Sequence, residues 1–243
     1  MSRVTIVVPC FDEEHRLDVG AFQSCRDAEF CFVNDGSRDN TLQVLQSLAA
    51  TDPGRFRVVN LPKNSGKAEA VRAGMIASLS RGADYVGFWD ADLATPLSEL
   101  PRFVETLDQR PDIQMVIGAR VRLLGREISR RPGRHYLGRF GATLISSSLG
   151  IAVYDTQCGA KLFRSSDVMR DIFSRPFLSR WIFDVEIIAR FIQRIGRDAA
   201  ARAMYELPLV VWHDVHGSKV TSRDYLRGLR DLWRIHRAYN SRR

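Results

Sequence analysis

The chain has 243 residues, of which 45% are hydrophobic and 26% are charged, so a substantial core and an enzyme-sized folded domain are expected. No stretch approaches the roughly 20 apolar residues needed to span a bilayer, which excludes insertion by a helix of this sequence. The net charge of +8 and the pI near 9.7 favour polyanionic partners. Charge alone does not choose among nucleic acid, phosphorylated small molecules and an anionic membrane surface.

The four cysteines, Cys10, Cys25, Cys31 and Cys158, form no C-x-x-C pair. Three of them sit near apolar segments, where a reduced thiol packs as a small hydrophobe. The N-terminus reaches "VTIVVP" without a signal-peptide pattern. We therefore expect a reduced cytoplasmic protein, in which any membrane contact is peripheral, at the inner face of the cell membrane.

The first half of the chain alternates strand and helix patterns. Short β-branched and aromatic runs predict strands at 4–11, 30–35, 55–62 and 85–92, and a further strand at 112–120. Segments of helical period lie between them, at about 13–27, 39–50, 66–81 and 96–109. Such alternation predicts parallel strands joined by crossover helices, and hence an α/β fold with a mainly parallel sheet flanked by helices.

The second half is less regular. Residues 121–135 are rich in arginine, and 136–153 are apolar with Arg139 as their only charge. Residues 155–164, "DTQCGAKLFR", are expected to form a loop that leads into short mixed elements. There is no linker and no internal repeat, so we expect a single domain over 1–220, followed by a C-terminal basic amphipathic helix over 221–243.

The C-terminal segment carries an apolar stripe at helical spacing. The stripe consists of Tyr225, Leu226, Leu229, Leu232, Trp233 and His236, with the arginines largely outside it. A basic helix with an aromatic edge suits a membrane surface, whereas the alternative is that the stripe packs on the domain. The uncharged run 140–154 has the same alternatives, a membrane interface or lipid-chain groove on one side and a buried core helix on the other.

Acidic residues follow two of the predicted strands. Asp35 ends one strand, and Asp90 and Asp92 end another, so all three are expected at one crevice beyond the carboxyl ends of the sheet. Helix capping is the structural alternative, but Thr95 and the following proline already supply an N-cap and a first-turn proline. Two carboxylates at i and i+2 suit a hard divalent cation that also binds phosphate oxygens.

Two other nucleotide-binding patterns do not fit. A dinucleotide fold needs G-x-G-x-x-G after the first strand, where this chain has "PCFDEE". The segment "NSGKAEAVRAG" departs from a phosphate-binding P-loop, with Ala68 at the Ser/Thr position and Leu61 at the first glycine. Gly66 and Lys67 nevertheless open a helix, where free amides and an ammonium can approach phosphate; the alternative is a solvated lysine.

Several motifs together resemble glycosyltransferase family 2. These are "VVPCFDEE", "VNDGSRDNT", "NSGKAEAVRAG", "DADLATP", "IGAR", "DTQCGAKLF", "RWIFDVEI" and "HGSKV", in the family's order and spacing from residue 4 to about 220. Within the family the chain is most similar to the dolichyl- and polyprenyl-phosphate β-glucosyltransferases. "DTQCGAKLF" with "RWIFDVE" carries that narrower similarity, whereas "VNDGS" with "DAD" marks the broad family.

The resemblance implies a GT-A fold, which binds a nucleotide sugar, and sugar transfer with inversion. It places Pro9, Asp12 and Glu13 or Glu14 at the base and ribose pocket, Asp35 at the base, and Lys67, Ser218 and Lys219 at the donor. It implies Mg²⁺ or Mn²⁺ on the donor diphosphate, held by Asp92 with Asp90, which also meets the ribose or sugar. Ala94 stands where mannosyl relatives have a glutamine near the metal, which favours either a glucosyl donor or a metal with fewer protein ligands. The membrane helices of many relatives are absent from this sequence.

The acceptor decides which further residues are needed. A sugar hydroxyl requires a carboxylate base, whereas a phosphate monoester is already charged at neutral pH and mainly needs cations to position it. Arg120 and Arg131, with Arg134 beside them, are the candidates for acceptor phosphate, and a solvated basic loop is the alternative. Asp155 and Asp184 are candidates for a base or for orienting the acceptor or the arginines. His213 and His216 form only a weak metal pattern.

Three functions remain open at this point. The leading hypothesis is transfer of a hexose, glucose, from a UDP-sugar to a polyprenyl or dolichyl phosphate at the membrane surface. The second is a family 2 enzyme acting on a soluble or glycan hydroxyl. The third is a non-catalytic binder of anionic surfaces, although nucleic acid is disfavoured because the aspartates would repel its backbone. The sequence predicts no oligomeric state.

Overall fold

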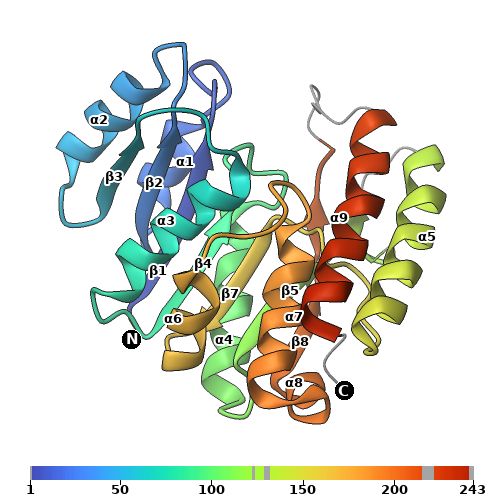
Figure 1. Cartoon of the computed structure of the whole chain (residues 1–243). Helices are drawn as coiled ribbons and strands as arrows, with labels where there is room; N and C mark the ends of the chain where they lie inside the picture. Colours follow the sequence, from blue (N-terminus) through green and yellow to red (C-terminus); the bar gives the residue numbers. More distant parts are fainter. Residues whose placement is uncertain (1, 122–123, 129–131, 215–221, 241–243) are drawn as a thin grey trace.

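The computed structural model describes residues 2–121, 124–128, 132–214 and 222–240. A seven-stranded sheet of order β3-β2-β1-β4-β7-β5-β8 forms its centre (Figure 1). Its strands are β1 (Val4–Cys10), β2 (Glu29–Asp35), β3 (Phe56–Leu61), β4 (Tyr85–Trp89), β5 (Met115–Ala119), β7 (Ala160–Arg164) and β8 (Met204–Pro208). Short strands β6 (Glu127–Ile128) and β9 (Val211–Trp212) pair separately.

The sheet is mainly parallel, which confirms the predicted fold class. Strands β3, β2, β1 and β4 are mutually parallel, as are β5 and β8. Strand β7 runs antiparallel to both of its neighbours, β4 and β5. The expectation of a loop over 155–164 is therefore wrong for its second half, which lies near the middle of the sheet. Lys161 interrupts the apolar pattern typical of a central strand, and only a tertiary partner makes its burial possible.

Helices cover both faces of the sheet (Figure 1). One face packs against α3 (Lys67–Leu79), α6 (Asp167–Ser174) and α7 (Phe183–Ile195). The other face packs against α1 (Val19–Ser24), α2 (Thr41–Thr51) and α4 (Leu100–Gln109), which follows the short turn η1 (Leu97–Glu99). Because side chains alternate along a strand, Val7 of β1 enters the first core and Ile6 and Val8 enter the second.

Two local expectations in the first half are corrected. The helix expected over 13–27 is shorter, because the first part of that segment forms a loop and α1 starts only at Val19. Thr95 does not provide a cap: η1 begins after Pro96 and has no side-chain cap hydrogen bond. The Thr95 side chain is buried instead, and the backbone carbonyl of Thr95 accepts a 2.7 Å hydrogen bond from Trp89 Nε1 in the core.

The rest of the chain adds helices at one edge of the sheet. Helix α5 (Pro132–Leu149) and α9 (Ser222–Asn240) lie side by side there, and α9 also contacts α7 (Figure 1). Helix α8 (Arg197–Ala203) leads from α7 into β8. The uncharged run 140–154 enters the core through Leu149 and Val153, as its core alternative expects. Among the described residues, no helix combines the length and apolarity that a bilayer span requires.

Helix α9 uses one face against the domain. Ile235 is 1% exposed, Leu232 packs on the core, and the Tyr239 hydroxyl donates to Glu186 Oε1 at 2.8 Å. Leu229 and Trp233, from the same predicted stripe, are 52% and 59% exposed. The described part of the stripe is therefore divided between packing on the domain and exposure to solvent, and the side chains of Tyr225 and Leu226 lie outside the described part.

Candidate active site

The site lies at the carboxyl ends of β1, β2 and β4, where the order in which strands are added to the sheet changes direction. Strand β1 pairs with β2 on one side and β4 on the other, and the carboxyl ends of strands at such a switch point are where open α/β sheets bind ligands. We call this end of β1, β2 and β4 the crevice. Asp12, just after β1, and Leu93, just after β4, have φ values of 52° and 50°. A left-handed backbone at non-glycine residues stores strain, and both examples in the described chain stand at this crevice.

The acidic segment after β1 is fastened to the loop after β2. Asp12 Oδ1 accepts a hydrogen bond from the Arg38 amide at 2.8 Å, and the Glu13 amide donates to Thr41 Oγ1 at 2.8 Å. The Glu14 carboxylate accepts from the amide and side chain of Asn40. These contacts bring the two loops together at the crevice. The predicted contacts of Pro9, Asp12, Glu13 and Glu14 with base and ribose stay predictions.

Asp35 shapes the loop that precedes α3. Its two carboxylate oxygens accept hydrogen bonds from the amides of Ser65, at 2.7 Å, and Gly66, at 2.8 Å. Asp35 is 2% exposed, and this burial raises its pKa by more than the two amides lower it. Gly66 has a φ of 94°, and a Cβ there would collide with the Arg180 guanidinium. The expected contact of Asp35 with the base is untested.

Asp90 and Asp92, which have no basic neighbour in the sequence, receive cations from distant segments. Lys67 Nζ lies 2.5 Å from Asp90 Oδ1. Arg16 approaches Asp92 Oδ2 at 3.8 Å and Glu13 Oε1 at 3.4 Å, so it bridges the loops after β1 and β4. Burial, followed by the charge of Asp90, raises the pKa of Asp92. The expected crevice therefore holds carboxylates and basic side chains in contact with one another.

Lys67 contacts Asp90 and lies in the electric field of two further carboxylates. Burial acts to lower its pKa, but Asp90, Asp184 and Asp92 together outweigh this effect and raise it. The side chain is 37% exposed and opens α3 at its first residue. The alternative of a simply solvated lysine does not describe this arrangement.

Gly159 gives Asp90 its place. The Asp90 amide donates to the Gly159 carbonyl at 3.0 Å, and a Cβ on Gly159 would overlap the Asp90 carboxylate. Sequence reasoning assigned no role to this glycine, although it lies in the quoted "DTQCGAKLF". Arg180, in "RWIFDVEI", was also missed; it is exposed, and its Nη2 donates to Asn64 Oδ1 at 2.8 Å beside the start of α3.

Arg120 and Asp155 form one bidentate pair. Arg120 Nε and Nη2 each lie 2.7 Å from an oxygen of Asp155, and the Arg120 amide donates to the same carboxylate at 3.0 Å. Burial acts to lower the pKa of Arg120, but Asp155 outweighs it, and the net shift is upward. Of the roles predicted for Asp155, orienting an arginine fits this geometry better than acting as a base.

Asp184 is likewise paired, with a residue that sequence reasoning missed. Lys161 is fully buried in β7, and its Nζ lies 2.5 Å from Asp184 Oδ1 and 2.6 Å from the Cys158 carbonyl. The ammonium also lies 5.1 Å from the centre of the Phe88 ring, a cation–π distance. The lysine inside "CGAKLF" was the available signal, because a lysine in an apolar run needs a buried partner.

The remaining predicted residues are only partly described. Arg131, His216, Ser218 and Lys219 lie outside the described residues. Arg134 belongs to α5, but its side chain is outside the described part. His213 is exposed, and its amide donates to the Ala94 carbonyl at 2.9 Å.

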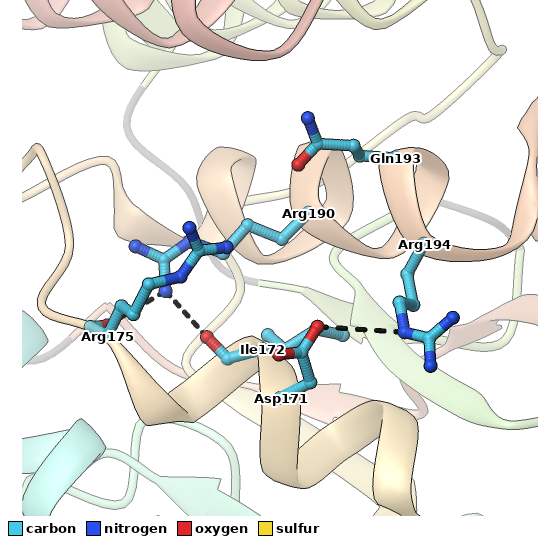
Figure 2. A pocket seen from close by; sticks show the side chains of 6 residues that line it. All are labelled: Asp171, Ile172, Arg175, Arg190, Gln193 and Arg194. Atoms are coloured by element: carbon cyan, nitrogen blue, oxygen red, sulfur yellow. Dashed lines mark hydrogen bonds and ion pairs between the residues drawn. The ribbon is translucent and has the colours of Figure 1, made fainter.

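A small cavity of about 60 Å³ between α6 and α7 contains none of the predicted site residues (Figure 2). It is lined by Asp171, Ile172, Arg175, Arg190, Gln193 and Arg194. Arg190 donates to the carbonyls of Ile172 and Arg175 and to Glu186. This arginine therefore closes the end of α6 and serves the fold.

The described residues include no group of three or more His, Cys, Asp or Glu side chains placed to hold a metal. Asp90 and Asp92 nevertheless supply two half-buried carboxylates, 34% and 28% exposed, in one crevice. Carboxylate oxygens are donors that Mg²⁺ and Mn²⁺ prefer, and Mg²⁺ sites commonly take their other ligands from phosphate and water. The pair fits a metal that is shared with a bound diphosphate.

Comparisons with known proteins identify the family to which the chain belongs. The model of "Glycosyl transferase family 2" matches residues 5–170. Dolichyl-phosphate beta-glucosyltransferase ALG5C of Trichomonas vaginalis is 32% identical over 248 residues, covering 95% of this chain and 70% of the relative. The dolichyl-phosphate beta-glucosyltransferases of Saccharomyces cerevisiae and Homo sapiens are 29% and 30% identical, over 97% and 90% of this chain and 75% and 70% of their own lengths.

Solved structures share the fold. The mannosyltransferase PcManGT from Pyrobaculum calidifontis, in complex with GDP-Man and Mn²⁺, superimposes with a TM-score of 0.64 at 20% identity. Staphylococcus aureus TarS 1-349, in complex with UDP, gives 0.58 at 16% identity. This chain is covered to 100% and 96%, and it spans 65% of each of those chains.

The family match covers well over half of the chain and includes the loops that form the crevice. It confirms the predicted resemblance, and the hypothesis of a non-catalytic binder is wrong because the relatives are transferases. The chain belongs to glycosyl transferase family 2 and is a glycosyltransferase with the GT-A fold.

Proposed function

We propose that this enzyme transfers glucose, with inversion, from UDP-glucose to a polyprenyl or dolichyl phosphate. The observation that carries the proposal is the identity of about 30%, over nearly the whole chain, to proteins named dolichyl-phosphate beta-glucosyltransferases. A relative named undecaprenyl-phosphate 4-deoxy-4-formamido-L-arabinose transferase, from Pseudomonas aeruginosa, is 32% identical over 68% of this chain and 48% of its own length. An isoprenoid phosphate is the acceptor that these names share.

The donor site we propose combines carboxylates and cations around the diphosphate. Asp92, with Asp90, would hold Mg²⁺ or Mn²⁺, which would neutralise charge on the leaving UDP. Lys67 is the first residue of α3 and the Arg180 guanidinium lies over Gly66, so two cations stand at the helix end whose dipole favours an anion. Ser218 and Lys219 complete the donor site in this proposal, on the family resemblance alone.

The acceptor phosphate attacks as an anion and requires no protein base. The ion pairs of both candidate bases support a mechanism without a protein base, because Asp155 is bound by Arg120 and Asp184 by Lys161. A carboxylate oxygen that already contacts a cation is less available to approach an acceptor hydroxyl. Arg120, Arg131 and Arg134 are proposed to position the acceptor phosphate, and Asp155 fixes the guanidinium of the first.

We further propose that the enzyme meets its lipid acceptor at a membrane surface through α9. Leu229 and Trp233 are exposed on this helix, and Arg230 and Arg234 lie on the same helix as exposed cations. Exposed aromatic and basic side chains together favour an interface of anionic lipid.

A transfer assay tests the proposal directly. The protein is incubated with Mn²⁺ or Mg²⁺, each of several nucleotide sugars, and either a short polyprenyl phosphate or a free saccharide. We expect UDP release only with UDP-glucose and polyprenyl phosphate, and a product with the β configuration. Transfer to the saccharide but not to the polyprenyl phosphate would overturn the proposed acceptor and make Asp155 or Asp184 the base to test.

A further inference from the structure

The ammonium of Lys67 occupies a carboxylate that the proposed function assigns to a metal. Lys67 Nζ lies 2.5 Å from Asp90 Oδ1, and both side chains are about one third exposed, at 37% and 34%. The backbone of Lys67 is held in place, because Asp35 binds the two amides that precede it. Its side chain has a flexible four-carbon stem, so the ammonium can move while the backbone stays.

A divalent cation and this ammonium compete for Asp90. A metal bound to the same oxygen at about 2.1 Å would lie no more than about 4.6 Å from Nζ, at which distance two positive charges repel. Asp92 and Asp184 add to the field that attracts Lys67. The lysine is therefore a counter-ion of the carboxylates that would otherwise bind the metal.

We propose that Lys67 is a displaceable counter-ion that couples metal binding to donor binding. Before the donor binds, its ammonium neutralises Asp90. When a divalent cation binds Asp90 and Asp92, the ammonium moves from Asp90 to the donor diphosphate at the start of α3. The inference rests on the proposed function, since it requires a metal at these aspartates and a diphosphate on the donor.

Two features support the transfer of the ammonium. Lys67 is the first residue of the 13-residue helix α3, so its side chain leaves the end at which phosphate is favoured. The Arg180 guanidinium lies over Gly66, the residue before Lys67, and adds a second cation near this end of the helix. The proposed donor diphosphate would therefore lie within reach of the displaced ammonium.

The coupling predicts a higher affinity for the metal when Lys67 is removed. In Lys67→Met the carboxylate of Asp90 is freed, so the protein alone should bind Mn²⁺ more tightly, by about fivefold. The matched control is Lys63→Met, which removes the same charge from an exposed position of the preceding loop. We expect the control to bind Mn²⁺ within about twofold of the wild type, because exposed charges are screened.

The experiment measures free Mn²⁺ by electron paramagnetic resonance, first without nucleotide and then with UDP. Wild type, Lys67→Met, Lys63→Met and Asp92→Asn are compared, with circular dichroism and Tm as checks of folding. Tighter binding of Mn²⁺ to Lys67→Met, together with a smaller enhancement of UDP binding by Mn²⁺, supports the inference. Should Lys67→Met not fold, Lys67→Gln replaces it.

Equal or weaker binding of Mn²⁺ to Lys67→Met overturns the inference, as does the absence of binding to both wild type and variant without nucleotide. The proposed function fails separately, if Asp92→Asn binds Mn²⁺ and UDP as the wild type does. An ion pair that only stabilises the fold would lower Tm in Lys67→Met and leave the affinity for Mn²⁺ unchanged, which also counts against the inference.

Discussion

Replacing Lys161 by methionine removes the ammonium from a buried ion pair at the centre of the sheet. The Lys161 side chain is 1% exposed and that of Asp184 is 6% exposed. Methionine fills nearly the same volume beneath Phe88, so the substitution changes charge and hydrogen bonding without leaving a large cavity.

The substitution lowers the free energy of unfolding because it leaves two buried groups without their partner. The Asp184 carboxylate is left in the core without its nearest cation, and removing one partner of a buried pair costs about 3–5 kcal/mol. The Cys158 carbonyl also loses a donor, worth about 1 kcal/mol. The sum is a large part of the roughly 5–15 kcal/mol that stabilises a typical domain. Asp184→Asn combined with Lys161→Met removes both charges and should recover about 2 kcal/mol or more of this loss.

The assay is a double-mutant cycle by urea unfolding, followed by tryptophan fluorescence and circular dichroism. Wild type, the two single variants and the double variant give the coupling free energy. Lys63→Met, at an exposed lysine, is the control and should change the free energy of unfolding by less than about 0.5 kcal/mol. A coupling below about 0.5 kcal/mol would show that Lys161 and Asp184 do not stabilise each other, and would refute the reasoning.

Three further outcomes are expected. Asp92→Asn should abolish metal-dependent UDP binding and transfer while Tm stays unchanged, and retention of more than about a tenth of the turnover, a loss under about 1.4 kcal/mol, contradicts the metal role. Gly159→Ala should displace the Asp90 carboxylate and lower kcat at least about tenfold with the chain still folded; wild-type kcat would show that the carboxylate's position is unimportant. Alanine at both Leu229 and Trp233 should reduce sedimentation with anionic liposomes without lowering Tm, since both side chains are more than half exposed; unchanged sedimentation removes α9 from the membrane contact.

The parallel half of the fold could be predicted because its pattern is local. The period of a strand or helix is a property of residues that are close in the sequence. Strands β1, β2, β3, β4 and β5 therefore lie within a few residues of their predicted ranges. Position after a strand is also local information, and it placed Asp35, Asp90 and Asp92 at one crevice. The family motifs added the chemistry that such a crevice performs.

What failed in the prediction depended on partners far away in the sequence. Strand β7 contains Lys161, which looks out of place in a buried strand until Asp184, 23 residues later, neutralises it. The apolar stripe of α9 could not be divided into packed and exposed parts, because α5 and α7 decide which side is covered.

The sequence by itself determined the class of fold, the family and the position of Asp35, Asp90 and Asp92 at the ends of strands, because each depends on short-range periodicity or on motifs. Only the tertiary structure decided how their charges are balanced. Lys67 with Asp90 and Arg120 with Asp155 are pairs that join separate elements across the sheet. Electrostatic partners are chosen by distance in space, and the folding of strands from both halves into one sheet sets that distance.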